Sequence, residues 1–376
     1  MKIGIITQPL RLNYGGLLQN FALQTTLERM GHKVETLDPP LFPSIPFKKK
    51  PIIFGKRFIK KILWGEGHIL QKHIIREYQV ISQNITSFID QYLNRRECCN
   101  FNTINKNDYD ALIVGSDQVW RPKYNKCIEN CFLDFAYNWD IKRISYAASF
   151  GTDEKEFSNG QLKVCKKLIH KFSSVSVREN SGIQLCHEYF NIEAKLVLDP
   201  TLLLDSSDYI NLFKDKYSLN NDRSDYLVCY LLNTSPNKQR IIDLVCKEKG
   251  LKPHKVYSQY ENVKAKLTER IQIPIEQWLH DFYNAKFVIT DSFHGCIFSI
   301  IFNKQFIVLE NCERGNSRFS SLLQVLNLES RLFSGDLSDV YSVISENINW
   351  SEVNLRLKKM QTISLSFLNE SLSEKN

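Results

Sequence analysis

The chain has 376 residues, of which 43% are hydrophobic and 24% charged, and its formal net charge is +8. This is the composition of an ordinary globular protein, and the length predicts two domains rather than one. No run approaches the roughly 20 apolar residues of a membrane span, and the first apolar segment is too short for a signal peptide, so we expect a cytoplasmic protein.

Strand-like and helix-like segments alternate along the first half of the chain, which predicts a parallel sheet covered by helices. Strands are expected over Lys2–Thr7, Lys33–Asp38, Ala111–Gly115, Arg143–Ser149, Ser174–Arg178 and Lys195–Asp199. Helices are expected over Leu18–Met30, near Leu70–Leu93, about Glu154–His170 and over Asn180–Tyr189.

A Pro-rich break after the second predicted strand leads into a basic stretch. From Lys48 to Lys61 this stretch contains lysines and one arginine but no acidic residue, with aromatic and aliphatic residues interleaved. The pattern suits the headgroup layer of an anionic membrane at the inner face of the plasma membrane, and a solvated surface arm is the alternative. Nucleic acid is not expected as a partner, because no recognised binding module accompanies the charge.

A polar run from Asp205 to Asp225 contains little that could form a core and is the predicted domain boundary. A second alternation follows, with strands over Tyr226–Leu232, Pro253–Tyr257, Phe287–Thr290 and Gln305–Glu310. Its helices are expected over Lys238–Lys249, Ile275–Asn284 and near Ser317–Leu326. Near the end, one apolar helix face is predicted from residues at steps of three and four, namely Val353, Leu357, Met360, Ile363 and Phe367.

These alternations predict an α/β fold of two Rossmann-like parallel-sheet domains that face a cleft. We place the first domain at residues 1–205, with the basic segment 46–79, and the second at residues 206–350. Residues 351–376 are predicted to form a C-terminal helix and tail.

The segment Asp291-Ser-Phe-His-Gly295 forms a polar corner between an apolar strand and an apolar helix. Such a corner lies at the carboxyl edge of a parallel sheet, where open α/β folds bind ligands, and the helix N-terminus favours an anion. His294 can donate, accept or release a proton near neutral pH. In the alternative reading His294 only caps the helix.

Arginines supply two further candidate anion sites. Arg178 ends an apolar strand, where an unpaired guanidinium would be costly, and its planar fork matches a carboxylate or phosphate. An ion pair with Glu179 is the alternative. Arg314 and Arg318 flank the start of a later helix, with surface salt bridges as the alternative.

Several familiar kinds of site are not indicated. The sequence lacks a Gly-x-Ser-x-Gly elbow and a His-Glu-x-x-His helix, and the loop around Gly15 and Gly16 fails the nucleotide fingerprint. Cys127 and Cys131 have loose metal-like spacing, but no second pair follows at zinc-site distance. We expect no metal site.

Six short motifs in order resemble those of the polysaccharide pyruvyl transferases. They are Asn13-Tyr-Gly-Gly16, Gly115-Ser-Asp-Gln-Val-Trp120, Ser145-Tyr-Ala-Ala-Ser-Phe-Gly151, Ser176-Val-Arg-Glu179, Leu198-Asp-Pro-Thr201 and Thr290-Asp-Ser-Phe-His-Gly295. The resemblance spans about residues 3 to 330. It implies a two-domain fold like that of type B glycosyltransferases and transfer of a pyruvyl group from phosphoenolpyruvate to a sugar, with no cofactor. The usual product of the family is a cyclic ketal across two hydroxyls of a hexose.

The resemblance also places Arg178 and His294 at the phosphoenolpyruvate site. We expect residues 206–350 to be the donor side and residues 1–205 the acceptor side. The predicted donor contacts are Arg178, His294, Phe293, Gly295, Ser292 and Arg318. The predicted acceptor contacts are Asn13, Tyr14, Gly15, Gly16, Ser116 and Gln118. We predict His294 as the acid or the phosphate-binding donor, and Asp117 as the base for the acceptor hydroxyl.

The expected partners are phosphoenolpyruvate and a lipid-linked precursor of a capsular polysaccharide or exopolysaccharide. A sugar-nucleotide glycosyltransferase of similar architecture is the first alternative. A non-catalytic glycan-binding protein on the same fold is the second.

Overall fold

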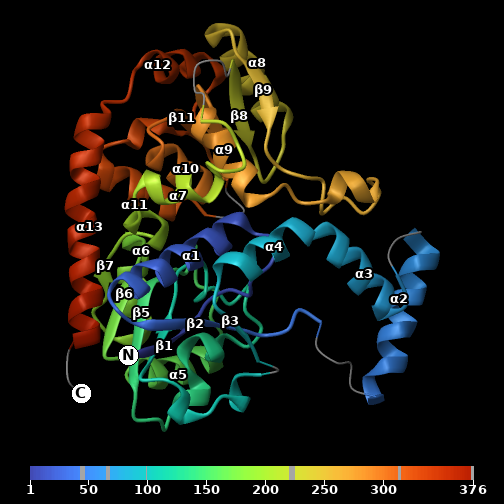
Figure 1. The fold of residues 1–376 in the computed structure, drawn as a ribbon, viewed down its shortest axis with the longest axis vertical. Helices are drawn as coiled ribbons and strands as arrows, with labels where there is room; N and C mark the ends of the chain where they lie inside the picture. Colours follow the sequence, from blue (N-terminus) through green and yellow to red (C-terminus); the bar gives the residue numbers. More distant parts are fainter. Residues whose placement is uncertain (43–46, 65–67, 99, 220–224, 312–314, 374–376) are drawn as a thin grey trace.

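A computed structural model describes residues 1–42, 47–64, 68–98, 100–219, 225–311 and 315–373 (Figure 1). Two parallel sheets, of seven and five strands, are flanked by helices. The predicted α/β class with two parallel-sheet domains is therefore confirmed. Among the described residues, no helix combines the length and apolar character needed to cross a bilayer.

The seven-stranded sheet has the order β3-β2-β1-β4-β5-β6-β7. Its strands are β1 (Lys2–Ile6), β2 (Lys33–Asp38), β3 (Arg95–Glu97), β4 (Ala111–Val114), β5 (Lys142–Ala148), β6 (Ser174–Val177) and β7 (Lys195–Leu196). One face packs on α1 (Tyr14–Arg29), and the other packs on α5 (Asn159–Ile169) and short helical turns before it. A six-residue helix, α6 (Asn180–Leu185), follows β6.

The five-stranded sheet has the order β12-β11-β10-β8-β9. Its strands are β8 (Tyr226–Tyr230), β9 (Lys252–Lys255), β10 (Phe287–Thr290), β11 (Gln305–Leu309) and β12 (Leu332–Phe333). The helices α8 (Pro236–Lys249) and α12 (Val340–Ser345) contribute to the core on one face. The helices α9 (Ile275–Asn284), α10 (Phe293–Ile301) and α11 (Ser317–Leu326) contribute to the core on the other.

One apolar cluster joins the two halves of the protein, because it includes residues of α1, α9 and α10 together. It also includes α7 (Ser206–Phe213), which lies inside the predicted polar boundary. Tyr209 is buried, its ring packs edge-on against Phe298 at 4.9 Å, and its hydroxyl donates to the Thr201 carbonyl at 2.8 Å. The prediction that Asp205–Asp225 contributes little to a core is therefore wrong for α7, and residues 220–224 lie outside the described residues.

The C-terminal helix α13 (Trp350–Ser373) runs along both halves of the protein (Figure 1). Val353 packs into the cluster that joins the halves, and Phe367 packs against the seven-stranded sheet. The predicted apolar face is wrong at Ile363, which is 53% exposed. Ser364 is buried instead, and its hydroxyl accepts the backbone N–H of Leu198 at 3.0 Å. A strict three-or-four spacing drifts off the buried face of a 3.6-residue helix over this length.

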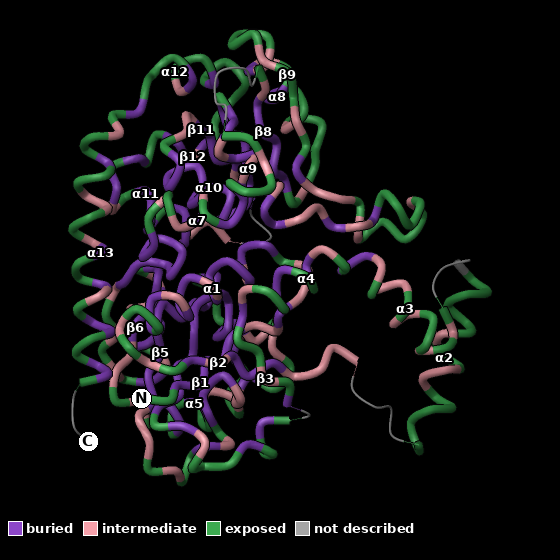
Figure 2. The backbone as a smooth tube through the Cα atoms, viewed as in Figure 1, coloured by how far each residue is buried: buried purple, intermediate pink, exposed green. Residues whose placement is uncertain are grey.

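The predicted helix near Leu70–Leu93 is two helices, α3 (Gln71–Ile81) and α4 (Gln83–Tyr92). The two helices separate at Ser82. There the carbonyl of Ile81 accepts the N–H of Gln272 at 3.0 Å, and this hydrogen bond takes the place of the one that a continuous helix would form with the N–H of Ile85. Before α3, the basic stretch forms α2 (Lys50–Trp64). Helices α2 and α3 extend away from the two sheets (Figure 1), and Figure 2 shows α2 as mostly exposed.

Candidate active site

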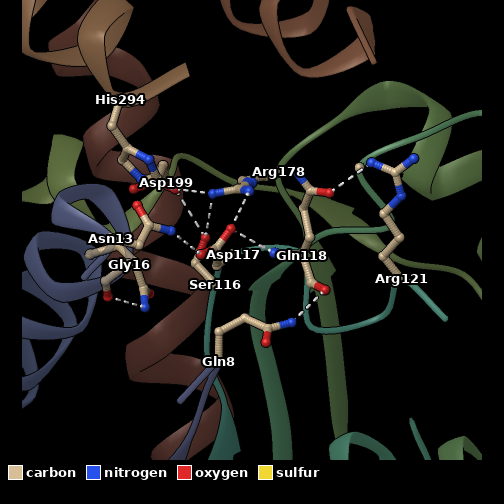
Figure 3. A network of polar contacts seen from close by, with 12 residues as sticks. Gln8, Asn13, Gly16, Ser116, Asp117, Gln118, Arg121, Arg178, Asp199 and His294 are labelled. Atoms are coloured by element: carbon tan, nitrogen blue, oxygen red, sulfur yellow. Dashed lines mark hydrogen bonds and ion pairs between the residues drawn. The ribbon is translucent and has the colours of Figure 1, made fainter. Parts of the chain in front are cut away.

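A buried polar cluster lies where the carboxyl edge of the seven-stranded sheet meets the start of α10 (Figure 3). Asp117 follows β4, Arg178 follows β6 and Asp199 follows β7, whereas His294 is in the first turn of α10. All four side chains are buried. Local sequence explains this placement, because each strand is an apolar run that ends in a polar corner. The edge is also where parallel sheets bind ligands.

Asp199 is at the centre of the cluster. Its Oδ2 accepts from Nη1 of Arg178 at 2.6 Å and lies 3.7 Å from Nε2 of His294. Its Oδ1 accepts from the hydroxyl of Thr201 at 2.6 Å. Burial alone would raise the pKa of Asp199, but His294, Arg178 and Thr201 outweigh it and lower that pKa. Asp199 was not among the predicted site residues, although it ends a predicted strand and stands in the Leu198-Asp-Pro-Thr201 motif.

Arg178 is held by carboxylates. Besides the bond to Asp199, its Nη2 lies 3.5 Å from Oδ1 of Asp117 and its Nε lies 3.8 Å from Oε2 of Glu179. Burial acts to lower the pKa of Arg178, and the three carboxylates reverse this and raise it. Ser116 completes the arrangement, because its hydroxyl accepts from Nη1 at 3.1 Å and donates to Asp199 at 3.0 Å. The Glu179 pair exists, but Asp199 is the closest partner.

Asp117 adopts a left-handed backbone conformation with φ of 72°. For a residue other than glycine this costs about 1–3 kcal/mol and is found mostly at functional sites. Its Oδ1 accepts the N–H of Gln118 at 2.8 Å, and its Oδ2 accepts from Nδ2 of Asn13 at 3.4 Å. These contacts orient the carboxylate toward the start of α1.

The helices α1 and α10 meet end to end at the cluster. Helix α1 begins at Tyr14 and not at Leu18, so Gly15 and Gly16 form its first turn rather than a loop before it. A Cβ atom on Gly15 would overlap the imidazole of His294, so only glycine allows this approach. Among the described residues no side chain caps α1, and its first turn lies against His294 in the first turn of α10. Two positive helix ends therefore converge beside His294.

His294 retains a free ring nitrogen. Its Nε2 makes no hydrogen bond to any described residue, because 3.7 Å from Asp199 is too long for one. A buried polar atom without a partner calls for an explanation, and a bound ligand would supply one at the start of two helices.

Phe293 packs beneath two arginines. The guanidinium of Arg178 lies 4.8 Å from the centre of its ring, and that of Arg318 lies 5.3 Å from it. Arg318 is buried, and burial, with the charge of Arg178, lowers its pKa to about 10. Arg314 lies outside the described residues.

The remaining predicted donor residues shape the start of α10. The hydroxyl of Ser292 accepts the N–H of Gly295 at 3.5 Å and caps the helix. A Cβ on Gly295 would overlap Oγ1 of Thr290, so glycine is required there by packing.

Two predicted acceptor residues have other partners. The hydroxyl of Tyr14 donates to the carbonyl of Ile273 at 2.9 Å, and its ring stacks on Trp278 at 5.6 Å, which ties α1 to the second sheet. The side chain of Gln118 turns away from His294 (Figure 3) and accepts from Arg121 at 3.0 Å. The structure thus brings together Asn13, Gly15, Gly16, Ser116, Asp117, Arg178 and His294, but not the side chain of Gln118.

A cavity of about 440 Å³ adjoins the cluster between the two halves. Asn13, Tyr14 and Ser292 form one part of its wall. The rest of the wall includes the leucines Leu12, Leu231 and Leu232 and a polar and aromatic set, namely Tyr230, Thr234, Tyr257, Ser258, Gln259, Tyr260, Glu261, Asn262 and Gln272. Tyrosine rings and amide side chains are suited to a sugar, which has apolar faces and hydroxyl edges.

Within the described part of the chain, no group of three or more His, Cys, Asp or Glu residues is arranged to hold a metal ion.

Comparisons with known proteins agree with this architecture. A family model described as polysaccharide pyruvyl transferase matches residues 13–313. UDP-GlcNAc 2-epimerase from Neisseria meningitidis bound to UDP-GlcNAc superposes with a TM-score of 0.51 at 10% identity, over 99% of each chain. Arabidopsis thaliana UGT89C1 complexed with UDP-L-rhamnose gives a TM-score of 0.51 at 11% identity, over 98% of this chain and 97% of that chain. These structures show the fold alone, and they confirm the predicted likeness to type B glycosyltransferases. A comparison with curated proteins finds no match.

Proposed function

The chain belongs to the polysaccharide pyruvyl transferase family, and we propose that it transfers a pyruvyl group from phosphoenolpyruvate to a hexose of a capsular or exopolysaccharide precursor. The product in this proposal is a cyclic ketal. The observation that carries the proposal is the unpartnered Nε2 of His294 where two helix N-termini converge. Such a place suits a small dianionic or trianionic donor.

The proposed reaction adds two hydroxyls of the acceptor to the central carbon of phosphoenolpyruvate. A proton is delivered to the methylene carbon, which becomes a methyl group, and the first hydroxyl oxygen bonds to the neighbouring cationic carbon. The bond from that carbon to the phosphate oxygen then breaks, and the second hydroxyl closes the ketal. One hydroxyl proton ends in the methyl group and the other leaves with phosphate. The scheme needs no cofactor beyond the donor.

His294 is the proposed acid or phosphate-binding group. Its Nε2 makes no hydrogen bond to a described residue, and it lies 3.7 Å from Oδ2 of Asp199. A positioned acid of this kind contributes about 10²–10⁴-fold in rate.

The donor anion is proposed to contact Arg178 through Nη2. Among the described residues, the polar partner of this nitrogen is Asp117 at 3.5 Å, whereas Nη1 is held at 2.6 Å by Asp199. Nη2 can therefore exchange its partner for an incoming anion at lower cost. Displacement of Asp117 would leave its carboxylate free to accept the proton of the acceptor hydroxyl, which is the role proposed for it.

The acceptor is proposed to lie in the cavity of about 440 Å³. Asn13 and Ser292 both line this cavity. Asn13 donates to Asp117, and Ser292 caps the helix α10 that contains His294. A sugar in the cavity would thus have its hydroxyls beside the cluster. We propose that this acceptor sugar is attached to a lipid carrier.

The test incubates the protein with phosphoenolpyruvate and glycosides of galactose, mannose or N-acetylhexosamine, in model and lipid-linked forms. We expect release of phosphate together with the mass gain of a carboxyethylidene group on one acceptor. The variant His294→Gln is the matched control and should release far less phosphate. Absence of product with every acceptor would contradict the proposal. Thermal stabilisation by a nucleotide-sugar but not by phosphoenolpyruvate would favour a sugar-nucleotide transferase instead.

A further inference from the structure

The helix α2 (Lys50–Trp64) presents an uncovered apolar face. Five large apolar side chains are between 52% and 66% exposed, namely Ile52, Phe58, Ile59, Ile62 and Leu63. At about 100° per residue these positions fall on one side of the helix. Single exposed apolar residues are normal on a protein surface, but a continuous stripe of them indicates an interaction site.

The charged residues of the same helix are all cationic. Lys56 and Lys60 border the apolar stripe on one side, and Lys61 lies across the helix from it. Between Phe47 and Trp64 the chain contains no acidic residue. On the other side of the helix Ile53, Phe54 and Arg57 are partly covered, and Arg57 donates to the carbonyl of Ile69 at 3.3 Å. The apolar stripe is therefore on the more exposed side.

This combination fits a lipid surface better than a protein partner. An apolar stripe with lysines along its border lets rings and aliphatic chains enter the acyl boundary while ammonium groups stay among the phosphates. A protein partner or a second copy would have to supply an apolar groove with acidic groups beside Lys56 and Lys60.

The arm that carries α2 is connected to the wall of the acceptor cavity. Glu77 of α3 pairs with Arg270, and Arg270 donates to the carbonyl of Tyr260 at 3.3 Å. Tyr260 lines the cavity of about 440 Å³. Figure 1 shows the chain around residues 258–270 projecting on the same side of the protein as α2 and α3.

We propose that α2 lies in the headgroup layer of an anionic phospholipid bilayer and thereby holds the acceptor cavity close to that surface. The interaction is peripheral, and it depends on both the apolar stripe and the bordering lysines. It places the cavity near the layer in which a lipid-linked acceptor would reside. Binding itself needs neither donor nor acceptor.

Co-sedimentation with vesicles tests this proposal. The wild-type protein should bind vesicles of phosphatidylcholine containing phosphatidylglycerol, and it should bind pure phosphatidylcholine much more weakly. The double variant Ile59→Ser/Leu63→Ser should lose at least about tenfold in vesicle affinity, because two inserted side chains are removed. The double variant Lys56→Gln/Lys60→Gln should lose about fivefold per charge, and the affinity of the wild type should fall as salt is added.

Matched controls lie on α13. Leu355 is 60% exposed, and Lys358 and Lys359 are exposed as well. Leu355→Ser and Lys358→Gln/Lys359→Gln should leave vesicle binding unchanged. Equal binding by wild type and Ile59→Ser/Leu63→Ser would overturn the proposal, as would a dimer in solution that this double variant abolishes. Because no substrate is present, failure here would leave the proposed reaction untouched.

Discussion

Gly15 of α1 packs directly against His294 of α10, so closely that a Cβ atom on Gly15 would overlap Nδ1 of the imidazole. The two residues belong to elements that cover different sheets. The orientation of His294 is therefore set partly by the backbone of the other half of the protein. Small changes at Gly15 should act on the site through this ring.

Replacing Gly15 with alanine should displace the imidazole and lower kcat/KM for phosphoenolpyruvate about 10²-fold, the cost of roughly 1 Å of misplacement. Gly160 is the matched control. It is also the second residue of a helix, and an added Cβ meets nothing within 4 Å. Gly160→Ala should keep full activity and raise stability by about 0.4–1 kcal/mol. Steady-state kinetics and thermal unfolding measure both, and equal activity of the two variants would refute the role of Gly15.

The variant His294→Gln should lower kcat about 10²–10⁴-fold if the ring delivers the proton. If the ring only binds phosphate, KM should rise while kcat changes little. The comparison is with His187→Gln, because His187 is exposed and does not belong to the cluster. Unchanged kcat and KM in His294→Gln would rule out either role.

Removal of the Asp199 charge should destabilise the fold strongly. Asp199 is buried and pairs with the buried Arg178 at 2.6 Å, so Asp199→Asn should cost about 3–5 kcal/mol. Asp108 provides the exposed counterpart, since it pairs with Arg96 at 2.7 Å and both side chains are about a third exposed. Asp108→Asn should cost about 0–1 kcal/mol. Urea unfolding gives both values, and costs of equal size would show that Asp199 is not the charge partner on which Arg178 depends.

His254 should make stability depend on pH. Its Nε2 lies 3.1 Å from Asp281, and this hydrogen bond raises the pKa of His254 above the usual 6.5. The protonated ring therefore stabilises the folded state below about pH 6.5, and this contribution is lost as the pH rises through the folded pKa. His254 is 39% exposed on its side chain, so the effect should stay below about 1 kcal/mol.

The measurement for His254 is the free energy of unfolding at about pH 5.5 and about pH 8.5. The difference between wild type and His254→Gln should be larger at the lower pH. In an Asp281→Asn background this pH dependence should vanish. If the difference in unfolding free energy between wild type and His254→Gln grew toward high pH, the pairing of protonated His254 with Asp281 would be contradicted.

Much of the architecture was predictable from local patterns. Apolar runs that end in a polar corner located β4, β6, β10 and the residues after them, including Asp117, Arg178 and His294. These strands and the residues after them can be located from the alternation of strand and helix and from the polar residues at the strand ends. Segments governed by distant contacts were predicted less well. The helix break at Ser82 depends on Gln272, and the burial of Tyr209 depends on Phe298.

The site shows the same division. Asp117, Arg178 and His294 were predicted as site residues because each follows an apolar strand, where a charge or an imidazole needs a partner. The order of strands in the seven-stranded sheet gives Arg178 its partners Asp117 and Asp199, and the packing of the two halves brings His294 to them. Only that packing makes Asp199 the shared neighbour of Arg178 and His294, and sets Gly15 against the imidazole. Hydrogen bonds and ring contacts act over a few ångströms, so they depend on residues far apart in the sequence that only the folded chain brings together.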